Sequence, residues 1–479
     1  MHVIHLSFEC YPVAKAGGLG DVVGALPKYQ QLSGVNAWVV MPRFHNKWVL
    51  SHQVEVVHRG ETVLGHERLT FEIHRVTDAD LGFPLFLVHV PGLLDRPGVY
   101  IDPESGYGYW DEFNRFLAFQ LSALNWIRSF SKFPDIIHCH DHHAALVPLL
   151  LSGSFDYSGM EHIPTVLTIH NGEYHGNYDM SKTFYLPTLK PNQIGFLEWG
   201  GRMNSLSSGI RKAWAVTTVS ESYLEELQDS AGGLEYLLRQ ESGKSYGIIN
   251  GIDDEVWNPS TDPLINHHYS LKTVKKGKRA NKEELCEYFN LDPEKPLFAF
   301  IGRLVKEKGA DLLPDLINWV LSERDDVSFV ILGTGDPWLH DRIKGLNQQF
   351  SGFFDSSIQY NEALSHKIYA GADFIMMPSR VEPCGLNQMY AMRYGTIPIV
   401  RSVGGLKDTV IDFESPGGYG VRFDYFNLDD AHHAIMRAMK LYEDKMLFRK
   451  TRAAIMKLNF SWNRSAEAYN RIYQTLHTK

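Results

Sequence analysis

The chain has 479 residues, of which 44% are hydrophobic and 22% are charged, and its formal net charge is −9. This length exceeds what one hydrophobic core normally supports, so two large domains are expected. The ordinary composition and modest acidic excess are those of a globular enzyme and give no reason to expect nucleic acid as a partner.

The cysteines, the N-terminus and the apolar runs indicate the cellular compartment of the protein. The four cysteines are far apart and form no CxxC pair, which argues against a zinc ribbon, a thioredoxin-type motif and a disulfide scaffold. The N-terminus reads as a first strand and not as a signal peptide. No run approaches the roughly 18 apolar residues that cross a bilayer, so we expect a cytoplasmic protein with no membrane partner.

Short apolar runs alternate with helical patterns along the first half of the chain. The runs are Val3–Phe8, Ala37–Met41, Leu85–Val90, Ile136–Cys139, Thr165–Ile169 and Ala215–Val219. Continuous runs of this kind predict a parallel sheet that is covered by helices on both faces.

The first motif, Lys15–Asp21 (KAGGLGD), lies between the first strand and a helix. Glycines let backbone N–H groups approach a phosphate, and the helix N-terminus and Lys15 favour an anion. The motif could also be a glycine turn that only packs helix on strand. A dinucleotide fingerprint is disfavoured because the loop is too long and the second strand ends without an acidic residue.

Histidines gather around the end of the fourth strand, in the segment 138–143 (HCHDHH). Because adjacent strand residues point to opposite faces, we expect most of these imidazoles not to converge on one ion, and we predict no metal site. Asp141 is expected to cap the following helix. His170 again follows a strand, where it could act by hydrogen bonding.

The segment from Asp253 to Asn281 interrupts this rhythm. It is rich in Pro, Asn, His and Lys and lacks a sustained apolar period, so it is read as the passage between two domains. The basic run Lys272–Arg279 within it is expected to be a solvated connector.

The rhythm restarts with strands expected at 297–301, 328–332, 373–377 and 396–400. Leucines and isoleucines between 312 and 321 form a helical stripe, with Pro314 in the first turn. We therefore predict an α/β protein with two Rossmann-like domains, 1–253 and 254–455, facing a cleft at the carboxyl ends of their strands. A terminal helix within 456–479 is expected to brace the N-terminal domain.

Two motifs of the second half favour an anionic ligand. Arg303 and Lys308 lie just beyond a buried strand, where a guanidinium fork and an ammonium can both reach an anion. Further on, Gly385 and Leu386 would present free N–H groups at a helix start, and Glu382 can accept hydrogen bonds from hydroxyls. A glycine pair at 404–405 is expected to form another helix start of the same kind.

Together, these segments resemble the bacterial glycogen synthases and plant starch synthases over nearly the whole chain. The matching segments include KAGGLGDVVGALP, RPGVY, HDHHAAL, TIHN, IGRLVKEKG, PSRVEPCGLNQMYAMRYG and RSVGGLKDTV, in the family's order. The resemblance implies a GT-B fold with a deep interdomain cleft and no metal or cofactor. It also implies retaining transfer of glucose from ADP-glucose to the non-reducing end of an α-1,4-glucan, in glycogen biosynthesis.

The resemblance also implies a set of site residues. The catalytic ones would be His170, Arg303, Lys308, Glu382 and Asp141. The substrate-binding ones would be Lys15, Gly17, Gly18, Asp21, Tyr100, Asn250, Tyr360, Cys384, Gly385, Leu386 and Asn387.

Some of these residues have a more specific implied role. Arg303 and Lys308 would bind the diphosphate, Tyr360 would stack on adenine and Tyr100 would lie near the acceptor. His142, where the family has Trp, and Asn387, where Thr is familiar, depart from the pattern.

Other functions remain open at this point. A related enzyme could use UDP-glucose or another acceptor. A dinucleotide-dependent oxidoreductase would explain two Rossmann-like halves but would need an acidic ribose-binding residue. A non-catalytic glucan-binding protein would use an aromatic group whose helical spacing is more typical of a core: Tyr107, Tyr109, Trp110, Phe113 and Phe116.

Overall fold

The computed structural model describes residues 1–478, which form two compact units. Unit 1 comprises Met1–Asn250 together with the segment that begins at Trp462, and unit 2 comprises Gly251–Ser461. Among the described residues, no helix is both long and apolar enough to cross a membrane.

Unit 1 is built on a nine-stranded sheet with the order β12-β11-β7-β6-β1-β2-β5-β4-β3. Its strands are β1 (His2–Leu6), β2 (Asn36–Pro42), β3 (Val54–Leu64), β4 (Glu67–Val76), β5 (Leu85–His89), β6 (Ile136–His140), β7 (Thr165–Ile169), β11 (Ala215–Thr218) and β12 (Ser245–Gly247). The strands from β12 to β5 are parallel, and β4 and β3 add an antiparallel edge. The parallel order reverses at β1 and β6, which is where a doubly wound sheet binds its ligand.

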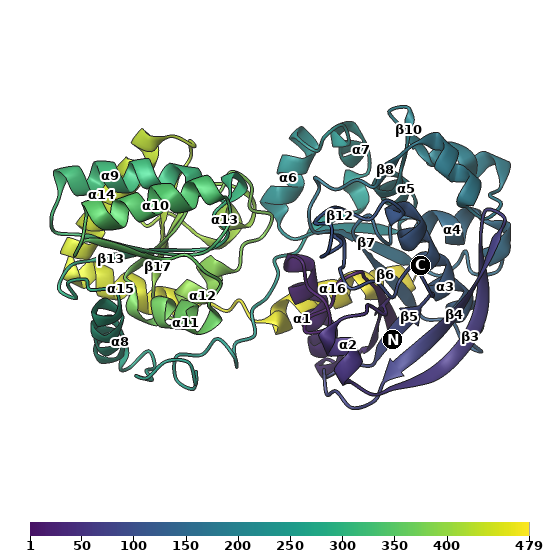
Figure 1. The fold of residues 1–479 in the computed structure, drawn as a ribbon, viewed down its shortest axis with the longest axis horizontal. Helices are drawn as coiled ribbons and strands as arrows, with labels where there is room; N and C mark the ends of the chain where they lie inside the picture. Colours follow the sequence, from purple (N-terminus) through teal and green to yellow (C-terminus); the bar gives the residue numbers. More distant parts are fainter. Residues whose placement is uncertain (479) are drawn as a thin grey trace. The chain divides into compact units, whose positions relative to one another are not determined.

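Helices cover this sheet and include the C-terminal segment. They are α1 (Gly18–Leu32), α2 (Lys47–Ser51), α3 (Glu112–Arg128), α4 (Val147–Gly153), α5 (Ser205–Lys212), α6 (Glu221–Asp229), α7 (Glu235–Gln240) and α16 (Trp462–His477), with short 3₁₀ turns η1 (Phe155–Tyr157), η2 (Met180–Tyr185), η3 (Pro191–Phe196) and η4 (Ser242–Lys244). A small antiparallel sheet joins β8 (Asn177–Tyr178), β10 (Arg202–Asn204) and β9 (Glu198–Trp199). Helix α16 lies beside α1, far from it in sequence, and buries Trp462 and Tyr473 in the core of unit 1 (Figure 1).

Unit 2 contains a parallel six-stranded sheet with the order β15-β14-β13-β16-β17-β18. Its strands are β13 (Leu297–Ile301), β14 (Ser328–Leu332), β15 (Phe354–Ser357), β16 (Phe374–Met377), β17 (Ile397–Arg401) and β18 (Val421–Phe423). Strands β13, β14, β16 and β17 lie close to the four predicted positions, and the two edge strands were not predicted. This is the strand order of a dinucleotide-binding fold, and its switch point lies between β13 and β16.

Helices lie on both faces of this second sheet, with α9 and α10 on one side and α11 and α12 on the other (Figure 1). The helices of unit 2 are α8 (Val274–Tyr288), α9 (Leu313–Glu323), α10 (Pro337–Gln349), α11 (Glu362–Gly371), α12 (Asn387–Arg393), α13 (Gly404–Thr409), α14 (Leu428–Glu443) and α15 (Lys445–Ile455), with 3₁₀ turns η5 (Lys306–Lys308) and η6 (Ala310–Leu312). The predicted stripe forms the buried face of α9, with Pro314 in its first turn.

The basic run Lys272–Arg279 is not a connector, because α8 begins within it at Val274. Most of its charged side chains are exposed as predicted, but Lys278 is only 2% exposed. The Lys278 ammonium donates to the carbonyl oxygens of Tyr369 (3.0 Å) and Tyr394 (3.2 Å) and to the hydroxyl of Thr396 (2.7 Å). Burial lowers the pKa of Lys278 well below its usual value. The local sequence could not reveal these acceptors because they lie 91 to 118 positions away.

Candidate active site

Polar residues of unit 1 gather where the central strands end. Glu9 follows β1, Asp141 follows β6, His170 follows β7 and Asn250 follows β12. All four are less than 9% exposed. Because β1, β6 and β7 are adjacent and parallel, their carboxyl ends bring Glu9, Asp141 and His170 to one edge of the sheet.

Asp141 is held in a strained backbone conformation beside His170. Its φ is +55°, in the left-handed region that non-glycine residues seldom adopt. Its carboxylate accepts a 2.7 Å hydrogen bond from the backbone N–H of His170. Burial, with a smaller contribution from the charge of Glu9, raises the pKa of Asp141 to about 7. The predicted helix cap is wrong, because α4 begins at Val147 and the carboxylate turns instead towards the end of β7.

Glu9 organises the glycine-rich loop, a role that the sequence reasoning missed. One carboxylate oxygen accepts the backbone N–H groups of Ala16 (2.6 Å) and Gly17 (2.8 Å), and the other accepts the hydroxyl of Tyr100 (2.8 Å). The available signal was an acidic residue directly after the first strand. The Gly17 amide, expected to contact a phosphate, is therefore bonded to Glu9 in this structure.

The remaining predicted residues of this loop lie at the start of α1. Lys15 forms a 2.7 Å ion pair with Asp21, and both side chains are partly exposed. Gly17 precedes α1 and Gly18 is its first residue. A phosphate that bound Lys15 would compete with the Asp21 carboxylate for the ammonium.

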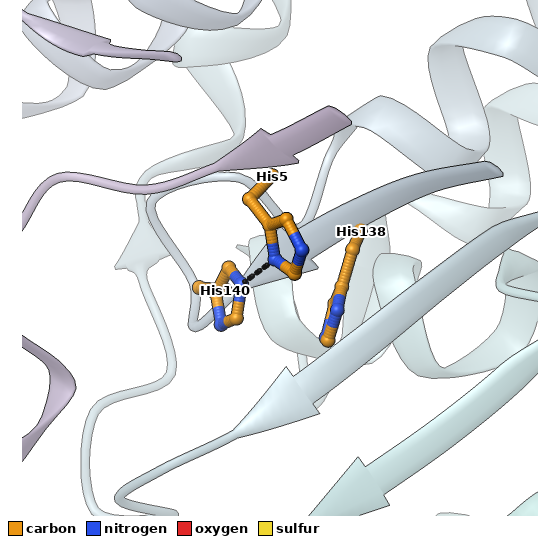
Figure 2. A group of neighbouring side chains, drawn as sticks. All are labelled: His5, His138 and His140. Atoms are coloured by element: carbon orange, nitrogen blue, oxygen red, sulfur yellow. Dashed lines mark hydrogen bonds between the residues drawn. The ribbon is translucent and has the colours of Figure 1, made fainter. Parts of the chain in front are cut away.

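Two of the clustered histidines, His138 and His140, converge with His5 of the neighbouring strand β1. His138 and His140 share one face of β6 because they are two residues apart, and His5 of β1 pairs in register with His138 (Figure 2). The three rings offer nitrogen atoms within 4.8 Å of one another. The pattern of β6 alone does not show this convergence, because His5 belongs to the neighbouring strand.

These rings are joined to polar neighbours by hydrogen bonds. Each of their six nitrogen atoms takes part in one, including the His5–His140 bond of 3.0 Å that is drawn in Figure 2. A metal ion would have to displace several of these bonds, so the geometry does not favour a site for a metal here. His142 and His143 lie apart from the three, and His143 stacks on Tyr100 with ring centroids 4.9 Å apart.

The five aromatic residues around the start of α3 lie partly on the surface and partly in the core. Tyr107 and Trp110 are 78% and 89% exposed, whereas Tyr109, Phe113 and Phe116 are buried. The prediction that all five pack in a core is therefore wrong for two of them, because α3 begins only at Glu112 and both precede it.

In unit 2, Lys308 and Glu382 meet at the switch point of the sheet. The Lys308 ammonium lies 2.8 and 2.9 Å from the two oxygens of the Glu382 carboxylate, which also accepts the Ser379 hydroxyl at 3.0 Å. Arg303 lies in the same loop as Lys308 and pairs with Glu307 at 3.2 Å. Its side chain is 65% exposed, so its guanidinium is accessible to a ligand.

The loops after β13 and β16 are tied together by their backbones. Arg380 donates its backbone N–H to the Glu307 carbonyl at 2.8 Å, and its guanidinium pairs with Asp311 at 2.6 and 2.8 Å. Gly309 has a φ of +68°, and a Cβ placed there would lie 1.9 Å from the carbonyl oxygen of Pro378. This close approach keeps Lys308 beside Glu382.

The other predicted residues of unit 2 also follow parallel strands. Cys384 is buried, Gly385 has a left-handed φ of +74°, and Leu386 precedes the first turn of α12. Asn387 donates to the carbonyl oxygen of Ile301 at 2.7 Å, which links the β16 loop to the end of β13. Tyr360 stands apart in the loop after β15 and is 82% exposed.

Comparison with known proteins agrees with this arrangement. Residues 2–240 match the starch synthase catalytic domain family, and residues 281–454 match the glycosyl transferases group 1 family. The chain is 48% identical to a glycogen synthase of Flavobacterium johnsoniae over 477 residues, which is 99% of both chains. It is 36% identical to a glycogen synthase of Kosmotoga olearia in an alignment that covers 99% of this chain and 98% of the relative.

Solved structures give the same answer. The catalytic domain of starch synthase IV from Arabidopsis thaliana, bound to ADP and acarbose, superposes with a TM-score of 0.87 at 32% identity, covering 100% of this chain and 99% of that one. A sucrose-phosphate synthase from Thermosynechococcus elongatus, with a TM-score of 0.62 at 16% identity, covers 100% and 99% and shares the fold. The chain therefore belongs to the glycogen and starch synthase family of retaining glycosyltransferases, with the GT-B fold that its motifs predicted.

Proposed function

We propose that the chain transfers glucose from ADP-glucose to the non-reducing end of an α-1,4-glucan, in the cytoplasm and without a metal or other cofactor. The ADP bound to the Arabidopsis starch synthase supports the donor, and the glycogen synthase relatives support the acceptor. The four cysteines are buried and form no disulfide, which suits a reducing compartment. Unit 1 would serve the acceptor and unit 2 the nucleotide sugar.

The observation that carries the proposal is the contact between Lys308 and Glu382 at the switch point of unit 2. In this structure the two charges neutralise each other. A bound diphosphate would draw on the charges of Lys308 and Arg303, and Glu382 would then accept hydrogen bonds from the hexose hydroxyls. Stabilising the charge of a leaving group in this way is worth about 2.7–4 kcal/mol for one well-placed donor.

The residues of unit 1 suit a sugar that becomes positively charged as the donor bond breaks. Burial lowers the pKa of His170 to about 3, so its ring is neutral at ordinary pH and does not repel that charge. The Asp141 carboxylate, when ionised, attracts it. The side-chain oxygen of Asn250 is buried and makes no hydrogen bond within the described residues, so it can accept one from a sugar hydroxyl.

Retention of configuration follows from a displacement on one face of the sugar. The bond from C1 to the phosphate oxygen breaks, the bond to the acceptor oxygen forms on the same face, and the acceptor proton passes to the departing diphosphate. A retaining glycosidase instead uses two carboxylates about 5–5.5 Å apart, one of which attacks C1. Here Glu382 is bound by Lys308, which leaves it suited to bind hydroxyls.

The test supplies the purified chain with labelled ADP-glucose or UDP-glucose, with and without glycogen, in the presence of a chelator. We expect label from ADP-glucose to enter glycogen and to be released by an enzyme specific for α-1,4 bonds. Transfer from UDP-glucose alone would overturn the proposed donor. Loss of transfer with chelator, restored by a divalent cation, would overturn the proposed independence from metal.

A further inference from the structure

Two chains of hydrogen bonds begin at the side-chain amide of Gln30, which is fully buried on α1. The first starts at its carbonyl oxygen, 2.8 Å from Nε2 of His5. It continues from Nδ1 of His5 to Nε2 of His140 (3.0 Å) and from Nδ1 of His140 to Nε2 of His170 (2.9 Å). The chain therefore ends at the ring proposed to contact the sugar.

The second chain starts at the amide nitrogen of Gln30, which donates to the hydroxyl of Tyr473 at 3.2 Å. That hydroxyl lies 2.6 Å from Nδ1 of His138, and Nε2 of His138 lies 2.6 Å from the hydroxyl of Thr168. Thr168 in turn contacts the hydroxyl of Thr217 at 2.5 Å. Tyr473 belongs to α16, so the last helix of the chain lies directly behind the sugar site of unit 1.

The amide sets the direction of both chains, because a neutral imidazole has one donor and one acceptor. The Gln30 carbonyl can only accept, so Nε2 of His5 carries the hydrogen and Nδ1 accepts. Nε2 of His140 must then donate, and Nε2 of His170 donates in its turn. The Gln30 NH₂ can only donate, so the Tyr473 hydroxyl donates onward to His138. Reversing one ring would set donor against donor in a buried site.

The four imidazoles and the Tyr473 hydroxyl stay uncharged. What can vary is which nitrogen of each ring carries the hydrogen. Burial lowers the pKa of His5 to about 4 and that of His170 to about 3, and it also lowers the pKa values of His138 and His140 well below their usual value. Burial also raises the pKa of Tyr473 well above its usual value, so its hydroxyl keeps the hydrogen that it donates.

We propose that Gln30 is a positioning residue that holds His170 in its Nε2–H tautomer, so that Nδ1 of His170 is left to accept a hydrogen bond from a sugar hydroxyl. The Tyr473 hydroxyl accepts from the other end of the same amide and carries its direction on to His138. The inference rests on the proposed role of His170 in the transfer reaction. It gives the fully buried Gln30 and Tyr473 a part in catalysis although neither contacts the substrate.

The direct test reads the tautomers by imidazole ¹⁵N NMR of the full chain, with resonances assigned through single histidine substitutions. We expect His5, His138, His140 and His170 all to carry hydrogen on Nε2. An Nδ1–H tautomer at His170, or rings in opposite directions along one chain, would overturn the proposal. The tautomers are read in the unchanged protein, and the substituted proteins serve only to assign its resonances.

The functional test compares Gln30→Met with Gln31→Met, its neighbour on α1. Each variant loses one side-chain amide, but Gln31 only donates to the backbone carbonyl of Ala37 at 3.0 Å. We expect Gln30→Met to give mixed tautomers at His170 and to lower kcat roughly tenfold, which one hydrogen bond of ordinary strength is worth, with KM unchanged. Gln31→Met should change neither.

Gln30→Glu separates the effect of hydrogen-bond direction from the effect of side-chain packing. A carboxyl group has a similar shape and can accept a hydrogen bond from His5 whether it is protonated or not. We expect it to restore both the Nε2–H tautomer of His170 and most of kcat. A loss of kcat in Gln30→Met with the His170 tautomer intact would overturn the positioning role. The tautomers are read without any donor, and kcat is measured with whichever nucleotide sugar the chain uses, so failure of the ADP-glucose proposal would be seen separately.

Discussion

Lys308 and Glu382 are 74 residues apart in the chain, yet the ammonium of one lies within 2.9 Å of both carboxylate oxygens of the other. A second ion pair, between the buried residues Lys282 and Asp373 at 2.6 Å, lies at the opposite end of β16. Each pair contains a residue from a segment that flanks β16, but only the first lies at the carboxyl edge of the sheet. The two pairs therefore separate catalytic from structural effects.

Glu382→Gln should lower kcat by about 10²–10³-fold, the usual effect of removing one well-placed polar group from an active site. The partly exposed Lys308 keeps access to water, so the thermal unfolding midpoint should move little. Steady-state transfer assays and thermal unfolding of the same preparation measure the two effects. Unchanged turnover in the folded variant would contradict the proposed contact with the sugar.

Asp373→Asn should lower stability and leave kcat nearly unchanged. Lys282 and Asp373 are both buried, and Arg452 adds a second cation at 2.9 Å, so neutralising Asp373 leaves buried positive charge and should cost about 3–5 kcal/mol. The folded fraction should retain nearly the kcat of the unchanged chain. The same variant serves as the matched control for Glu382→Gln, and a large loss of kcat in it would show that the contrast between the two pairs fails.

The pH dependence of transfer should reflect Asp141. Its pKa is raised to about 7, chiefly by burial, and its ionised form would stabilise a positively charged sugar, so kcat should rise as the pH increases through about 7. The free energy of unfolding should change with pH in the opposite direction. Because the folded pKa exceeds the usual value of 3.8, the contribution of the protonated group to stability is present at low pH and is lost as the pH rises through about 7.

Two substitutions assign this pH dependence. Asp141→Asn should remove the rise in kcat and lower its plateau, and Glu9→Gln should move the rise to lower pH because the charge of Glu9 raises the pKa of Asp141. Profiles of kcat against pH for the three proteins provide the measurement. A rise that persists in Asp141→Asn belongs to another group.

The sequence predicted the positions of several site residues because these residues follow the ends of strands. Parallel strands bring their carboxyl ends to one edge, so the positions of Asp141, His170, Lys308 and Glu382 followed from short apolar runs alone. The roles first proposed for them came from the family resemblance. The predicted helix α9 and the four predicted strands of unit 2, β13, β14, β16 and β17, follow from equally local patterns, whereas the edge strands β15 and β18 were not predicted.

Two features could not be predicted because they depend on contact between distant segments. His5 joins His138 only through the register of β1 on β6, and Lys278 is buried by acceptors in α11 and just before β17. Glu9 was overlooked because its partners Ala16 and Tyr100 lie in irregular loops. No periodic pattern in the sequence encodes these pairings.

Glu9→Ala should loosen the glycine-rich loop. It removes the acceptor for the backbone N–H groups of Ala16 and Gly17, so their hydrogen exchange should accelerate. If this loop contacts the donor, KM for the nucleotide sugar should rise as well. Tyr100→Phe, which removes only the hydroxyl that bonds the other oxygen of Glu9, should leave the exchange of both amides slow. Equal exchange in the two variants would contradict this role of Glu9.

Gly309→Ala should damage both stability and turnover, because Gly309 meets two constraints at once. Its φ of +68° is unfavourable for alanine, and the added Cβ would lie 1.9 Å from the carbonyl oxygen of Pro378. Gly352 has a φ of +85° but no atom within 4 Å of the added Cβ, so Gly352→Ala measures backbone strain alone, about 1–2 kcal/mol. Gly309→Ala should exceed that cost and should also lower kcat, since moving the Pro378 backbone separates Glu382 from Lys308. Equal shifts of the unfolding midpoint in the two variants, with kcat unchanged in both, would show that the close contact of these loops does not hold the ion pair in place.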